Sequence, residues 1–118
     1  MKPQSAKAKG RKLQQWVRDI ILESFPSLEA DDVRSTSMGA GGEDVQLSPA
    51  ARRLMPYSIE CKSVEKLNVW AAYEQAEANS GEHEPLLVMK KNRKEPLVVL
   101  DAKAFINLIK SIECATNK

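Results

Sequence analysis

The sequence has few of the residues from which many kinds of functional site are built. Its 118 residues include two cysteines, Cys61 and Cys114, which form no CxxC motif, and one histidine, His83. This set supplies neither a zinc site nor a disulfide framework. No stretch approaches the roughly 20 apolar residues of a membrane-spanning helix, and the N-terminus lacks the apolar core of a signal peptide. We therefore expect a cytoplasmic protein with no membrane partner.

The net charge of +2 is small, but the charges are segregated along the chain. Basic residues gather before residue 13, at Arg52 and Arg53, and at residues 90–94, whereas acids gather at residues 23–44 and 74–84. Basic foci around an acidic centre are typical of a protein that contacts phosphates at its periphery and holds a metal ion in the middle. Alternatively, each basic cluster only keeps its own segment solvated.

Two acidic residues and a lysine occur where two neighbouring strands are expected. Asp44 lies at the start of one strand, and Glu60-Cys61-Lys62 ends the next. Because side chains alternate along a strand, Glu60 and Lys62 share one face and Cys61 points the other way, into a core. If the strands pair, Asp44 and Glu60 converge on a divalent cation, with Lys62 beside the water that the cation activates. This is the minimal equipment of a metal-dependent nuclease.

An acid-x-lysine tripeptide is expected about once by chance in a chain of this length, so its context matters. A second copy, Asp101-Ala102-Lys103, stands between the apolar run at residues 97–100 and a helical pattern. Its aspartate is typical of a helix N-cap, and we interpret this copy as structural. The Glu60 copy ends an expected strand, with Asp44 before it and a helix after it. We therefore interpret Glu60-Cys61-Lys62 as the functional copy.

Hydrophobic periodicity predicts a single domain at residues 10–114, between a flexible basic arm at 1–9 and a tail at 115–118. The expected order is a helix from residue 10 that Pro26 ends, strands at 31–36, 43–47 and 57–62, a helix at 68–79, strands at 86–89 and 97–100, and a helix at 102–113. Residues 48–56 are expected to form a helical turn or an extended lobe. The predicted buried stripes are Leu13, Trp16, Val17, Ile20 and Ile21 in the first helix and Phe105, Ile106, Leu108, Ile109 and Ile112 in the last.

The order of elements, with Asp44 and Glu60-Cys61-Lys62 on adjacent strands, resembles the PD-(D/E)XK nuclease superfamily over residues 10–100. The basic stretch at residues 9–12 and the stretch Arg34-Ser35-Thr36-Ser37 before the aspartate are similar to archaeal-type Holliday junction resolvases, including phage-borne relatives. The resemblance implies an α/β fold with a restriction-endonuclease-like αβββαββα core, in which helices flank a mixed sheet. It also implies a bacterial, archaeal or phage-infected host cell.

The resemblance also implies roles for individual residues. Asp44 and Glu60 would be Mg²⁺ ligands, with the backbone carbonyl of Cys61 as a further ligand and Mn²⁺ as a substitute cation. Lys62 would orient or activate the attacking water. Gln75 is similar to the glutamine that many superfamily members carry beyond the lysine strand.

One position departs from the pattern, because the resolvases carry a glutamate in the first helix. Gln14 or Gln15 is the best match here. We expect Gln14 or Glu43 in the outer shell of the metal site. Asn79 shares a helix flank with Gln75, but an ordinary exposed position is an equally good interpretation for it.

The function that follows is a magnesium-dependent, structure-selective DNA endonuclease that resolves four-way junctions as a homodimer. The alternatives are a general, branched-DNA or single-strand nuclease of the same fold, and a catalytically silent DNA-binding module. Trp16 is expected in the core, whereas Trp70 is either a dimer contact or a ring that faces DNA. The candidate DNA-binding residues are Lys7, Lys9, Arg11, Lys12, Arg34, Ser37, Arg52 and Arg53.

Overall fold

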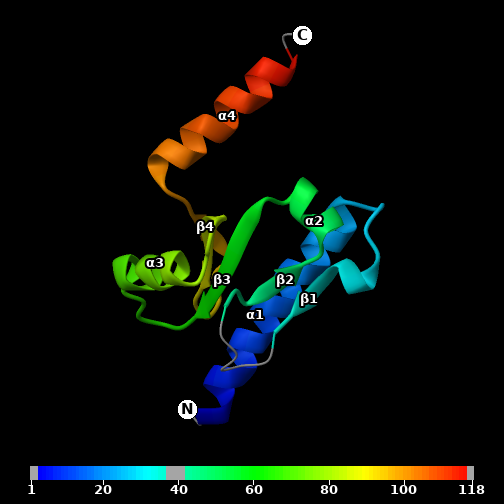
Figure 1. Ribbon diagram of the computed structural model, residues 1–118. Coiled ribbons are helices and arrows are strands. Elements are labelled where there is room, and N and C mark those ends of the chain that lie inside the picture. Colours follow the sequence, from blue (N-terminus) through cyan, green and yellow to red (C-terminus); the bar gives the residue numbers. More distant parts are fainter. Residues whose placement is uncertain (1–2, 37–41, 117–118) are drawn as a thin grey trace.

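The computed structural model describes residues 3–36 and 42–116 of the chain, which form a five-stranded mixed sheet with helices on its faces (Figure 1). The helices are α1 (Pro3–Ser24), α2 (Pro49–Leu54), α3 (Val69–Ala78) and α4 (Ala102–Thr116), with a short 3-10 helix η1 (Ala30–Asp32). The strands are β1 (Val33–Ser35), β2 (Val45–Leu47), β3 (Tyr57–Ser63), β4 (Glu84–Lys90) and β5 (Leu97–Val99). The predicted α/β architecture and the order of its main elements are confirmed.

The strands follow one another across the sheet in sequence order. β1, β2 and β3 form an antiparallel meander in which Val45 pairs with Ile59. β4 then lies parallel to β3, with Ile59 opposite Leu86, and β5 returns antiparallel at the edge. A parallel pair needs a crossover connection, and α3 provides it.

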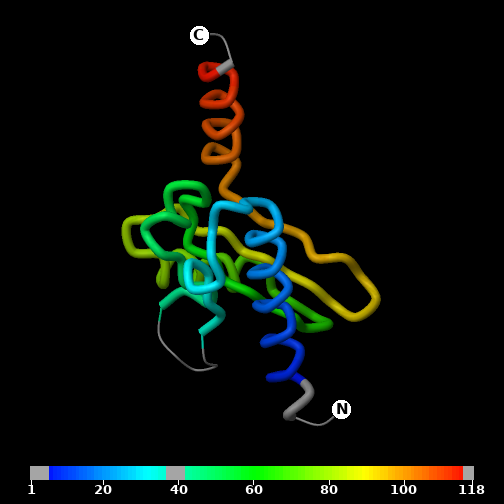
Figure 2. Tube along the Cα trace, turned by 90° about the vertical axis from the view of Figure 1, so that its right-hand side faces the viewer, coloured from blue at the N-terminus to red at the C-terminus, as the bar shows by residue number. Residues whose placement is uncertain are grey.

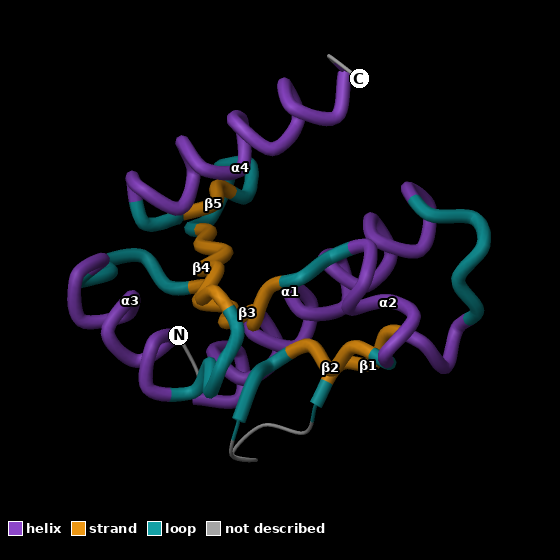
Figure 3. Tube along the Cα trace, turned by 45° about the horizontal axis from the view of Figure 1, so that its top comes forward, coloured by secondary structure: helices purple, strands orange, loops and turns teal. Residues whose placement is uncertain are grey.

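The two faces of the sheet are covered by different helices (Figure 3). α1 packs Leu13, Val17 and Ile21 against one face, where Ile59 and Cys61 of β3 join the main core cluster. On β4, Leu86 and Val88 face the same cluster, so Leu87 points to the opposite face, where α3 packs. Alternation along β3 therefore directs Glu60 to the α3 side of the sheet.

Side-chain caps explain where three helices begin. The Ser48 hydroxyl accepts a hydrogen bond from the Ala51 N–H at 3.1 Å, and Pro49 follows in the first turn of α2. The Asn68 side chain accepts from the Ala71 N–H at 3.1 Å at the start of α3. Asp101 accepts from the Ala104 N–H at 3.0 Å before α4, which confirms the structural interpretation of the second acid-x-lysine copy.

Several local expectations differ from the structure. α1 begins at Pro3, so residues 3–9 are helical rather than a flexible arm, and α4 extends through residues 115 and 116. Trp16 is 45% exposed, so its expected place in the core was wrong. The core-facing stripe of α1 consists of Leu13, Gln14, Val17 and Ile21.

The expected packing of the last helix was also wrong. α4 stands away from the body, and all five residues of its predicted buried stripe are between 36% and 62% exposed (Figure 2). A periodic apolar pattern predicts that a helix buries one face, but it does not specify what covers that face. Within the described residues, no helix combines the length and apolarity needed to cross a membrane.

Candidate functional site

Asp44 is fixed at the start of β2 by backbone bonds to both neighbouring strands. Its N–H donates to the Ile59 carbonyl at 2.9 Å, and its carbonyl accepts from the N–H and the hydroxyl of Thr36 at 2.9 and 3.0 Å. The carboxylate Oδ2 accepts a hydrogen bond from the backbone N–H of Cys61 at 2.7 Å. Asp44 is therefore held against the middle of β3, beside Glu60.

Glu60 lies in the middle of β3 and is 4% exposed. Its Oε1 accepts a hydrogen bond from the side-chain amide of Asn79 at 3.3 Å, and its Oε2 lies 3.8 Å from the Lys62 ammonium nitrogen. Asn79 is the C-cap residue of α3, so the C-terminal end of this helix holds the Glu60 carboxylate in place. The spacing of two residues along the strand brings Glu60 and Lys62 together, as the sequence predicts.

Both carboxylates are in an environment that disfavours negative charge. Burial raises the pKa of Glu60, and the charge of Asp44 raises it further, while the Asn79 hydrogen bond and Lys62 partly offset both effects. Burial likewise raises the pKa of Asp44 against the opposing effects of the Cys61 N–H and Lys62. A cation between the two carboxylates would remove the repulsion.

The donor set suits a hard divalent cation. Among the described residues, no group of three or more histidine, cysteine or acidic side chains is placed to hold a metal ion. A cation here would have two carboxylates, Asp44 and Glu60, and backbone oxygens, with water completing its shell. Mg²⁺ accepts such a set because it prefers oxygen ligands and keeps several waters.

The Cys61 side chain belongs to the core and not to the site. It is buried among the residues that pack on α1, and its burial together with the nearby charges of Asp44 and Glu60 raises the pKa of the thiol. The thiol therefore stays protonated and is a poor nucleophile. The backbone of Cys61 serves the site by orienting Asp44.

Glu43 and Arg52 bind each other beside the site. The Arg52 guanidinium forms an ion pair with both carboxylate oxygens of Glu43 and donates to the Tyr57 carbonyl at 2.8 Å. Both side chains are largely buried. The pair joins the residue before Asp44 to α2 and to the start of β3, so the structure gives both residues a positioning contact in addition to their predicted outer-shell and DNA-binding roles.

The other predicted residues are spread around the site. Gln75 is exposed on α3, and Asn79, one turn later, is the residue that contacts Glu60. The signal for Asn79 was its place on the same helix flank as Gln75, at the end of the helix. Gln14 is buried on α1, which covers the Cys61 face of β3, and its outer-shell role stays a prediction.

Most of the predicted DNA-binding residues lie on the surface. Lys7, Arg11, Lys12, Arg34 and Arg53 are exposed, Lys9 is partly buried, and Ser37 lies outside the described residues. Lys9 and Lys12 line a groove of about 460 Å³ together with Trp16 and Lys90. The sequence pattern placed Trp16 in the core and therefore missed this aromatic side chain among the lysines.

Comparison of the chain with models of protein families, with curated proteins and with solved structures found no match.

Proposed function

We propose that this protein is a magnesium-dependent DNA endonuclease that hydrolyses phosphodiester bonds at Asp44, Glu60 and Lys62. The observation that carries the proposal is the meeting of two carboxylates of raised pKa beside a lysine, each fixed by a hydrogen bond from a different element. Groups with perturbed pKa values that share one site are typical of catalytic centres.

Phosphodiester hydrolysis builds negative charge on the phosphate oxygens, and a bound Mg²⁺ would supply the stabilisation of that charge and an activated water. The residues of the chain position the reactants. The Cys61 N–H and the Asn79 amide hold the two carboxylates in place. Lys62 extends from the same face as Glu60 and provides a positive charge beside the attacking water.

The resemblance to junction resolvases supports four-way DNA junctions as the substrate and a cytoplasmic homodimer as the active form. Two sites related by a twofold axis would cut opposing strands of a junction symmetrically. The exposed basic residues of α1 and Arg53 would contact the phosphates. A nuclease with a broader DNA preference and a silent DNA-binding module are the alternative outcomes of the test.

The test is cleavage of a panel of labelled DNAs, comprising junction, flap, splayed arm, single strand and duplex, with and without Mg²⁺. We expect Mg²⁺-dependent cleavage with a preference for the junction. Lys62→Ala should abolish cleavage and leave junction binding largely intact, because binding depends on peripheral phosphate contacts. Lys66→Ala is the matched control, since Lys66 is an exposed lysine in the loop that follows β3.

The possible results distinguish a junction-selective nuclease from a general nuclease and from a silent DNA-binding module. Cleavage of every DNA at similar rates would indicate a general nuclease. Binding without cleavage at any Mg²⁺ or Mn²⁺ concentration would indicate a silent binding module. Full activity of Lys62→Ala would remove this residue from the mechanism.

A further inference from the structure

The last helix of the chain is amphipathic and uncovered. Phe105, Leu108, Ile109 and Ile112 recur at the spacings of three and four that form one helical stripe, with Ile106 at its margin. None of the side chains at residues 105–115 is buried. An isolated helix of this length is marginally stable in water, so we expect its apolar stripe to pack against a partner.

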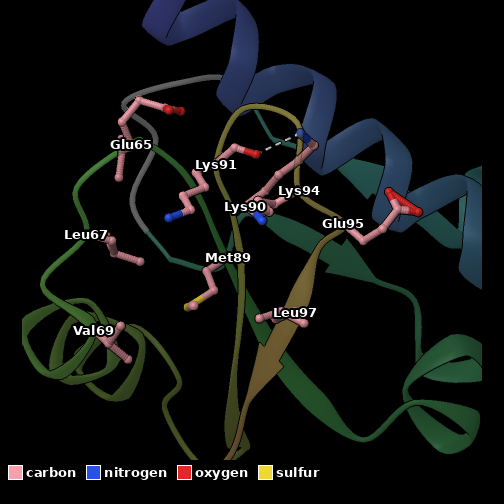
Figure 4. Close-up of a pocket in the computed structure, with 10 residues that line it drawn as sticks. Glu65, Leu67, Val69, Met89, Lys90, Lys91, Lys94, Glu95 and Leu97 are labelled. Carbon is pink, nitrogen blue, oxygen red and sulfur yellow. Dashed lines mark hydrogen bonds between the residues drawn. The ribbon is translucent and has the colours of Figure 1, made fainter.

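The body of the protein has an apolar surface that is also uncovered. A groove of about 490 Å³ lies between the start of α3 and the strands β4 and β5. Its apolar lining consists of Leu67, Val69, Met89 and Leu97 (Figure 4), together with Val64. Lysines and glutamates at residues 65, 90, 91, 94 and 95 line the other end of the groove. Leu97 is 59% exposed, although it belongs to a strand.

The chain's own α4 leads away from this groove. Leu97, at the start of β5, lines the groove, whereas α4 departs from the other end of that strand. Leu100 packs against the core, and both the side chain and the carbonyl of Asp101 accept hydrogen bonds from the first turn of α4. These contacts fix the residue at which the helix begins, beside the core, and α4 extends from there away from the body (Figure 1).

We propose that this protein forms a twofold dimer in which α4 of each copy covers the apolar groove of the other. The proposal concerns these two surfaces alone and does not rest on the nuclease activity. A second copy supplies both partners at once, because in the part of the chain that the structure describes an apolar helix and an apolar groove are both uncovered. Such reciprocal contacts are what a twofold axis produces.

The exposed apolar area of α4 suits a second copy of the chain as its partner. Its five apolar side chains are between 36% and 62% exposed and together expose on the order of 400 Å². This is close to the apolar share, about 60%, of the roughly 800 Å² that each partner contributes to a stable interface. Exchange also covers the groove, where Val64 and Leu97 are exposed, whereas pairing of the two helices alone would leave the groove open. Apolar patches of this size on one chain mark interaction sites.

Sedimentation velocity of the full chain over a range of concentrations tests the dimer. The parent should associate reversibly, and Ile109→Asp should raise the dissociation constant by on the order of 100-fold or more, because it places a charge in the centre of the interface. Asn107→Asp is the matched control on the polar face of the same helix and should dimerise like the parent. Both positions are exposed, so neither change threatens the fold of the monomer.

Leu97→Asp decides between exchange and helix pairing. It should weaken the dimer as Ile109→Asp does, whereas a dimer that survives Leu97→Asp would overturn the exchange. A parent that stays monomeric up to roughly 100 μM would overturn the dimer itself.

Disulfide trapping gives an independent readout. In a Cys114→Ser background, a mixture of Leu97→Cys and Ile109→Cys chains should form a disulfide-linked heterodimer. The remaining Cys61 is buried and should not compete. If the mixture forms no more heterodimer than a mixture of Leu97→Cys with Asn107→Cys, the helix does not lie in the groove.

Discussion

Without metal, the Glu60→Gln variant should be more stable than the parent protein. With Mg²⁺ bound to the parent, the variant should be the less stable of the two. Glu60 is a buried carboxylate whose pKa is raised by burial and by Asp44. Glutamine keeps the shape and an oxygen that can accept the Asn79 hydrogen bond, but it removes the charge. The two effects have opposite signs because the negative charge of Glu60 opposes folding when no cation is bound and supports the binding of a cation.

The sign of the pH dependence follows from the direction of the pKa shift. Above the folded-state pKa, the native protein carries an anion that the unfolded chain accommodates better, so the cost to stability is fully present there. Below the unfolded-state pKa, about 4.3 for glutamate, both states are protonated and this cost disappears. The gain from Glu60→Gln should therefore grow as the pH rises through the folded-state pKa and disappear as the pH falls below about 4.

The expected gain without metal is on the order of 1 kcal/mol, the usual size of the effect of a single substitution on stability. The loss of the carboxylate partner limits the gain only slightly, because the Lys62 ammonium lies 3.8 Å away and is partly solvated. In a domain of this size 1 kcal/mol shifts Tm by roughly 4 °C. Mg²⁺ at ten times its Kd stabilises the parent by about 1.4 kcal/mol, which is roughly 6 °C.

Thermal unfolding followed by circular dichroism, in EDTA and in a Mg²⁺ series, measures both effects. The Tm of Glu60→Gln should be higher than that of the parent in EDTA and should rise little with Mg²⁺. The order of the two Tm values should therefore reverse as Mg²⁺ is added. Asp101→Asn is the control, because it also exchanges a carboxylate for an amide and asparagine caps a helix as well as aspartate does. A variant that melts below the parent in EDTA, or that gains as much from Mg²⁺, would refute the reasoning.

Three further substitutions address the neighbours of the site. Asn79→Ala removes a hydrogen bond that lowers the pKa of Glu60, so the acidic limb of the cleavage rate should move to higher pH; an unchanged pH–rate profile would show that this bond does not tune the carboxylate. Arg53→Ala should weaken DNA binding for all sequences and reduce the salt slope by roughly one unit. Arg52→Ala should instead lower the free energy of unfolding by about 2 kcal/mol in urea titrations, because it removes the partly buried partner of Glu43. Equal effects of the two arginine changes on stability would contradict this division.

Much of the site follows from local sequence rules. Alternation along a strand places Glu60 and Lys62 on one face and Cys61 on the other, whatever the strand packs against. The caps at Ser48, Asn68 and Asp101 follow from residue type and position. The order of elements is equally local, because the spacing of apolar residues differs between helices and strands.

The contacts between distant residues depended on the tertiary structure. Asn79 and Gln75 share one helix flank, and only the way α3 crosses the sheet brings Asn79 to Glu60. Arg52 had no sequence signal that distinguished it from Arg53, and the position of Glu43 beside α2 selected it for the buried ion pair. Hydrogen bonds and ion pairs act over a few ångströms, so the packing of the elements decides which partners meet.

The apolar stripes of the helices likewise combine a property that the local sequence determines with one that the tertiary structure decides. Periodicity predicts a stripe in α1 and another in α4, and the two patterns look equally suited to a core. In the structure α1 covers the sheet, whereas α4 leaves the body from the edge strand and exposes its stripe. The sequence alone determined that each helix has an apolar face, because that is a local property of residue spacing. Only the tertiary structure decided which face is buried, because burial depends on where the chain directs each helix.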